Sequence, residues 1–145
     1  MPVILLSIIA GLVAGAAIGI QNPLASIMGQ RVGLLQSAFV IHVGGAVISG
    51  LLLMVVPGGQ LGAWRTVPWY ALAAGGLGVI LITSVSFTIP RIGIAATVGL
   101  LVAAQLSVGA WLDHHGHLEV AVRTFDAWRA LGIIMLLGGT WLVLR

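Results

Sequence analysis

Long apolar runs follow one another along the chain, and short segments that hold charged residues, proline or glycine separate them. Most runs reach the roughly 20 residues that a helix needs to cross the hydrocarbon core of a membrane. We therefore predict an all-α integral membrane protein. Its five transmembrane helices are expected at about residues 3–28, 33–56, 67–89, 91–112 and 126–144.

Breaker residues mark the ends of two of these helices. Pro57-Gly58-Gly59 ends the second helix, because proline lacks an amide proton and glycine relaxes the backbone. The short Pro90-Arg91 junction makes the third and fourth helices a hairpin. The fifth helix is the shortest, since residues 130–144 between its flanking arginines span only about 22 Å at 1.5 Å per residue.

The chain is expected to form a single domain over residues 1–145. Its longest polar segment, residues 113–126, is too short to fold alone and is expected to be a surface loop. The sequence starts with Met1-Pro2-Val3, without the basic region that opens a signal peptide, and further apolar runs follow. We expect the first helix to remain in the mature protein.

Composition excludes several classes of protein. Hydrophobic residues make up 60% of the chain and charged residues 6%, whereas soluble domains carry roughly 25% charged residues. The arginines are spaced singly and form no basic run that could follow phosphates, so we expect no nucleic-acid partner. The chain has no cysteine, which excludes disulfides, thiolate metal sites and cysteine nucleophiles.

Small residues recur at helical spacing within the predicted spans. Such residues let two helix backbones approach closely, which supplies packing contacts in lipid. An alternative role is a sliding surface during transport. The candidate packing glycines are Gly11, Gly15 and Gly19 in the first helix, Gly75 and Gly78 in the third, and Gly99 in the fourth.

The arginines give no preferred orientation in the membrane. With five spans, Arg65, Arg123 and Arg129 share the side of the N-terminus, and Arg31, Arg91 and Arg145 share the other side. The positive-inside rule orients a chain by the difference between its two faces, and that difference is zero here. Either the chain inserts in both orientations and pairs as an antiparallel homodimer, or a helper or the N-terminus fixes one orientation.

Several motifs are shared in order and spacing with one family. They are Gly75-Gly76-Leu77-Gly78, Ile89-Pro90-Arg91-Ile92-Gly93, Ala104-Gln105, Leu112-Asp113-His114-His115-Gly116, Arg129-Ala130-Leu131-Gly132 with Gly138, and Phe39 with Gly44-Gly45. The chain thereby resembles, over nearly its whole length, the YdcZ-type membrane proteins of the drug/metabolite transporter superfamily. Two positions depart from the family pattern: Ala25 replaces an asparagine four residues after Gln21, and Ala104 replaces a glycine.

The resemblance implies a half-size bacterial inner-membrane transporter, similar to small multidrug exporters that work as antiparallel dimers. It names no substrate. Those relatives exchange protons for cations at a glutamate inside the membrane, and no acidic residue lies inside a predicted span here. Coupling would therefore have to use Asp113 at a helix end, His42 or another group.

Polar side chains at membrane depth are costly and are therefore candidates for function. Gln21 and Asn22 precede Pro23, which frees a backbone carbonyl, so they are candidates for binding substrate, as are His42 and Gln105. Each has an alternative: Gln21 and Asn22 as an ordinary helix end, and His42 and Gln105 as hydrogen-bonding contacts to a neighbouring helix.

Asp113 and Arg91 bracket the fourth helix and are candidates for coupling or gating. They lie too far apart to pair within one straight helix, but Arg91 of one chain could approach Asp113 of an antiparallel partner. Three hydroxyl residues are expected only to bond carbonyls of their own helix, namely Ser84, Ser86 and Thr88.

The histidine-rich segment from Asp113 to Glu119 could bind a metal ion adventitiously, but nothing fixes its ligand geometry. We expect no metal site and no cofactor. No nucleophile, base and orienting group lie together, so we expect no catalytic residues and no enzyme. The leading hypothesis is an exporter of an unknown small molecule in the bacterial inner membrane, with the lipid bilayer and a second copy as partners. A passive channel and an accessory subunit are the alternatives.

Overall fold

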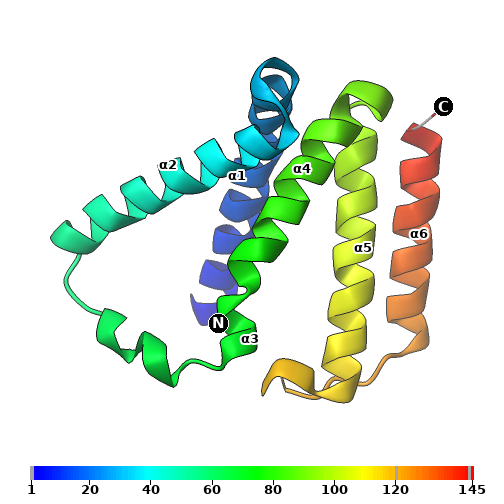
Figure 1. The fold of residues 1–145 in the computed structure, drawn as a ribbon. Coiled ribbons are helices and arrows are strands. Elements are labelled where there is room, and N and C mark those ends of the chain that lie inside the picture. The colour runs from blue at the N-terminus through cyan, green and yellow to red at the C-terminus, as the bar shows by residue number, and fades with distance from the viewer. Residues whose placement is uncertain (1, 120, 144) are drawn as a thin grey trace. The chain divides into compact units, whose positions relative to one another are not determined.

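The computed structural model describes residues 2–119, 121–143 and 145, and over these residues the chain is helical throughout its regular structure. Figure 1 shows the helices in chain order. They are α1 (Pro2–Val32), α2 (Leu34–Val55), the 3₁₀ turn η1 (Leu61–Thr66), α3 (Trp69–Leu72), α4 (Ala74–Ile92), α5 (Ile94–His115), the 3₁₀ turn η2 (His117–Glu119) and α6 (Ala127–Val143).

Four stretches are long and apolar enough to cross a membrane, namely Val3–Val32, Leu34–Val55, Trp69–Ile92 and Ile94–His115. The third of these joins α3 and α4 into one span. The fifth predicted span, α6, is also apolar but has only 17 residues. The prediction of an all-helical membrane protein is thus confirmed, with four long spans and one short apolar helix.

Helix α1 continues through Pro23 and ends four residues beyond the predicted boundary at residue 28. Proline cannot donate a hydrogen bond to the carbonyl one turn earlier, which here belongs to Gly19. Membrane helices tolerate such a gap because neighbouring groups can satisfy the freed carbonyl. Pro23 therefore interrupts the hydrogen bonding of α1 without ending the helix.

Two tight helix–helix turns use the same residue pattern. Arg31-Val32-Gly33 joins α1 to α2, and Arg91-Ile92-Gly93 joins α4 to α5. The φ angles of Gly33 and Gly93 are 105° and 83°. Residues with a Cβ rarely adopt these values, so glycine is what permits each break between consecutive helices. Pro90 lies inside α4, and the break predicted at Pro90-Arg91 occurs at Gly93 instead.

The chain divides into two compact units, Met1–Pro90 and Arg91–Arg145. In the first unit, α1 and α2 meet at the Gly33 turn and diverge away from it (Figure 1). The buried core of this unit contains Ala25 of α1, Ala38 of α2 and Ile82 of α4. Small side chains at this point allow three helices to approach one another closely.

In the second unit, α5 and α6 run side by side in opposite directions (Figure 1). Gly99 of α5 faces Thr140 of α6: a Cβ added to Gly99 would lie only 2.5 Å from Thr140 Oγ1 and 2.8 Å from its Cγ2. Gly99 thus lies at a close contact between two helices. The single domain predicted from the sequence stays a prediction.

Large apolar side chains cover the exterior of both units. Met54 is 85% exposed and Trp69 81% exposed, and most leucine, isoleucine and valine residues of the spans are also exposed. A soluble protein of this size rarely presents continuous apolar surface of this extent. The exterior therefore suits a lipid environment.

Candidate substrate sites

Three helices of the first unit meet at one backbone carbonyl. Ser37 Oγ of α2 and Ser86 Oγ of α4 both donate to the carbonyl oxygen of Ala25 in α1, at 3.0 Å and 2.9 Å. All three residues are buried. Since buried polar groups need partners, these two bonds hold α2 and α4 at a defined height against α1.

Ser86 therefore does not behave as the sequence suggested. It bonds a carbonyl of α1 rather than one of its own helix. Ser86 lies against Gly29 of α1, where an added Cβ would be only 2.6 Å from Ser86 Cβ. Because Gly29 has no Cβ, α1 and α4 can approach closely enough for this bond. Thr88 does bond its own helix, donating to the Ser84 carbonyl at 2.7 Å, as predicted.

Asn22 lies one turn before this contact and is 1% exposed. Neither its Nδ2 nor its Oδ1 has a hydrogen-bond partner among the described residues. The next polar residue on this face, Ser26, accepts a bond from Gln30 Nε2 at 3.3 Å. Gln21, the other candidate amide, is exposed. The structure thus separates the two amides and buries only Asn22.

His42 of α2 is half-buried and faces α4. Its Nδ1 lies 2.7 Å from the Ala38 carbonyl, and since a carbonyl only accepts, Nδ1 carries the proton of this bond. In the neutral ring, Nε2 then has a lone pair. A Cβ added to Gly78 would lie 2.5 Å from Nε2, so Gly78 lies at the contact between α2 and α4.

The remaining candidate packing glycines have open surroundings. A Cβ added to Gly11, Gly15, Gly19 or Gly75 would have nothing within 4 Å among the residues that the structure describes. No other helix in the described part of the chain packs closely against these glycines. Their role in packing stays a prediction, and it would require a second chain.

In the second unit, Asp113 near the end of α5 pairs with Arg129 in the first turn of α6. Asp113 Oδ2 and Arg129 Nη1 are 3.3 Å apart, and each side chain is 31% exposed. Asp126 Oδ1 accepts the backbone N–H of Arg129 at 2.8 Å and so caps the helix. Arg129 was not among the residues predicted for coupling, although Asp113 and Arg129 flank the loop of an antiparallel hairpin and must therefore lie at the same end of it.

This ion pair lines a pocket of about 400 Å³ between α5 and α6. Gln105, Gly109 and Asp113 follow one another at intervals of four residues and share a face of α5. The pocket thus brings together Gln105 and Asp113, two residues that the sequence singled out separately. Its other lining residues are Leu106, Ala110, Arg129, Gly132 and Ile133.

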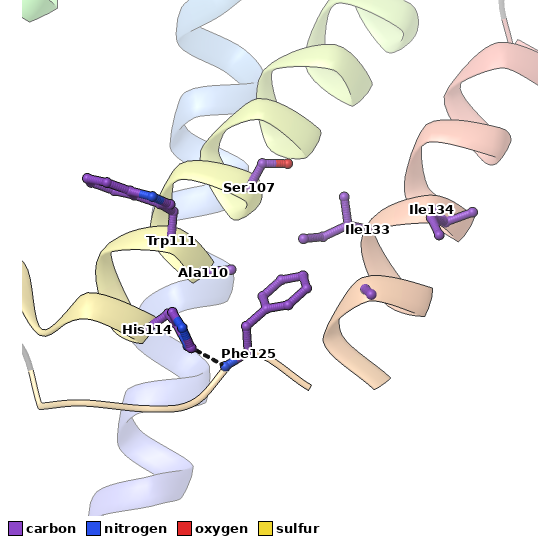
Figure 2. Close-up of a pocket in the computed structure, with 8 residues that line it drawn as sticks. Ser107, Ala110, Trp111, His114, Phe125, Ile133 and Ile134 are labelled. Carbon is purple, nitrogen blue, oxygen red and sulfur yellow. Dashed lines mark hydrogen bonds between the residues drawn. The ribbon is translucent and has the colours of Figure 1, made fainter. Parts of the chain in front are cut away.

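A second pocket of the hairpin, of about 600 Å³, is apolar and contains aromatic side chains. Figure 2 shows Phe125, from the loop before α6, between α5 and α6, with Trp111 and His114 on α5. The backbone N–H of Phe125 donates to His114 Nδ1 at 3.1 Å, which fixes the loop at this point. The two pockets share Ala110 and Ile133 and otherwise use different residues.

The histidine-rich segment after Asp113 forms ring contacts. Trp111 and His115 have centroids 4.8 Å apart, and His115 stacks on His117 at 5.6 Å. Within the described ranges, no three His, Cys, Asp or Glu side chains are arranged to hold a metal ion. Arg91 lies in the last turn of α4, and its predicted contact with Asp113 of another chain stays a prediction.

Comparison with known families supplies the decisive observation. The family model described as "Putative inner membrane exporter, YdcZ" matches residues 6–142. The chain belongs to the YdcZ family. Searches of curated proteins and of solved structures each returned no match.

Membership of the YdcZ family confirms the resemblance identified in the sequence motifs. The family is one of inner-membrane exporters within the drug/metabolite transporter superfamily, and it is not an enzyme family. Together with the apolar helices of α1 to α6, this makes the chain a multi-pass protein of the inner membrane.

Proposed function

We propose that this YdcZ-family chain exports a small molecule across the bacterial inner membrane as an antiparallel homodimer. The observation that carries the proposal is the family match over residues 6–142, which includes every described span except the ends of α1 and α6. Larger transporters are built from two inverted repeats, and a second copy of this chain would supply the second repeat.

Charge supports the antiparallel arrangement. Three arginines are expected on each side of the membrane, so insertion in either orientation has a similar free energy. Two oppositely oriented copies reproduce the inverted repeats that are found inside larger transporters. In such a dimer, Arg91 of one copy reaches the level of Asp113 of the other, where it can compete with Arg129.

Polar residues of both units are the candidates for contact with the exported molecule. In the unit Met1–Pro90 the candidate residues are Asn22 and His42, and in the unit Arg91–Arg145 they are Gln105, Asp113 and Arg129, which line one pocket. The first unit contains no acidic residue, so only the second offers a carboxylate to a proton or a cation. Coupling is therefore assigned to Asp113.

The test of export uses cells that lack the chain and cells that express it or its Asp113→Asn variant at equal level. Small molecules in the medium are compared by mass spectrometry. We expect at least one compound to accumulate outside the cells with the unaltered chain and not with the variant. Identical media from all three strains would contradict export by this chain.

A further inference from the structure

The ion pair between Asp113 and Arg129 leaves most of its hydrogen-bonding capacity unused. A guanidinium can bind a carboxylate through two parallel N–H donors, yet here only Nη1 contacts Asp113, at 3.3 Å. Nη1 also lies 3.5 Å from the Arg123 carbonyl. Arg129 Nη2 and Nε, and Asp113 Oδ1, make no hydrogen bond to residues in the described part of the chain. Both charges can thus accept a further partner.

The two charges lie at the end of a pocket of suitable size. Its volume of about 400 Å³ falls within the range of about 300–1,000 Å³ that is common for small-molecule sites. Gly109 of α5 and Gly132 of α6 line the pocket beyond the charges, and a Cβ added to either would have nothing within 4 Å. Space therefore extends along α5 from the ion pair toward Gln105.

The two helix ends strengthen this separation of charge. Asp113 lies in the last turn of α5, where unpaired carbonyls give the helix a partial negative charge. Arg129 lies in the first turn of α6, where backbone N–H groups give a partial positive charge. A positive ligand group is thus favoured at Asp113, and a negative one at Arg129.

We propose that this pocket binds a zwitterion of the α-amino acid class. The ligand carboxylate lies on the Nη2 and Nε donors of Arg129, and the ligand ammonium lies on Asp113. The ligand side chain extends past Gly109 toward Gln105, whose exposed amide has no hydrogen-bond partner among the described residues. This inference rests on the proposed export function and names the class of the exported molecule.

A zwitterion fits better than an ion of one sign. A simple anion on Arg129 would add a second negative charge beside Asp113, and a simple cation on Asp113 would add a second positive charge beside Arg129. An excess charge in a partly buried site is costly, and each side chain of this pair is about two-thirds buried. A zwitterion supplies both opposite charges at once and so avoids that cost.

The test measures binding to the purified full chain in lipid nanodiscs. The proteinogenic amino acids are added separately, and the melting temperature is followed by tryptophan fluorescence. Calorimetry then measures the dissociation constant of the amino acid that raises the melting temperature most. The same measurement is made for its amide, which lacks the negative charge, and for its deaminated analogue, which lacks the positive charge. We expect the loss of either charge to weaken binding roughly 10- to 100-fold.

Variants that keep both charges test the pocket itself. Gly109→Leu fills the space beside Asp113, where an added Cβ has nothing within 4 Å among the described residues, and should abolish binding. Gly138→Leu is the matched control, because Gly138 is a glycine of α6 with equally open surroundings and does not line the pocket. The Gly138→Leu variant should bind the amino acid with the same dissociation constant as the unaltered chain.

Three outcomes would overturn the inference: no amino acid raises the melting temperature, an analogue with one charge binds as tightly, or Gly109→Leu binds normally. Binding in nanodiscs depends neither on orientation in cells nor on export. Failure of this inference is therefore distinguishable from failure of the proposed function, which the media comparison tests separately.

Discussion

Asn22 is buried with both polar atoms of its side chain unpaired among the described residues. More than 90% of buried polar groups have a partner, and a missing one costs about 1–3 kcal/mol. The freed carbonyl of Gly19 lies one turn earlier in α1. A polar group of the exported molecule or a water molecule would satisfy both.

The substitution Asn22→Leu separates a binding role from a structural one. Leucine has a similar size and no polar group, so the variant loses the penalty of the unpaired amide and should be more stable by about 1–3 kcal/mol. The measurement is the melting temperature of purified protein. Gln36→Leu, which alters an exposed amide of α2, is the control and should change it little. A lower melting temperature for Asn22→Leu would mean that the amide is bonded in the folded protein.

At the scale of helices, the sequence predicted more of the structure than it did at the scale of contacts. The runs of apolar residues located every span, and α2 (Leu34–Val55) differs from its predicted range by one residue at each end. Pro90 was a weaker breaker than expected, since it lies inside α4, whereas Pro23 lies inside α1 as its predicted range allowed. The breaks between α1 and α2 and between α4 and α5 occur instead at Gly33 and Gly93, which have positive φ.

Contacts between helices were harder to predict, because a one-dimensional pattern does not fix the relative height of two helices. The bond from Ser86 to the Ala25 carbonyl depends on the height at which α4 packs against α1. Ser86 alone is equally able to bond its own helix, as Thr88 does. The pair of Asp113 and Arg129 could have been predicted, since both residues flank the one loop of a hairpin.

The contact of α5 with α6 gives a prediction at this scale. Gly99→Ala places a methyl group against Thr140, so α5 and α6 must separate, and we expect a loss of about 1–3 kcal/mol in unfolding free energy. Adding Thr140→Ala to the Gly99→Ala variant should restore much of the lost unfolding free energy. Denaturation of the single and double variants measures this coupling. Gly139→Ala, with nothing near its added Cβ, is the control. Equal stability of Gly99→Ala and Gly139→Ala would show that the contact is loose.

At the scale of the whole molecule, the chain combines an apolar exterior with an even distribution of arginines. The family match makes it a member of a family described as inner-membrane exporters, and the antiparallel homodimer is the central proposal. That proposal requires that copies of one sequence insert in both orientations. A single fixed orientation is incompatible with it.

The absence of cysteine allows a direct measurement of orientation. Gln60→Cys places one thiol in the exposed segment between α2 and η1. Intact and permeabilised cells are then treated with a membrane-impermeant maleimide. The antiparallel homodimer predicts that about half of the chains react in intact cells and all react after permeabilisation, since the two orientations are equally favoured. Complete labelling of intact cells, or none before permeabilisation, would contradict it.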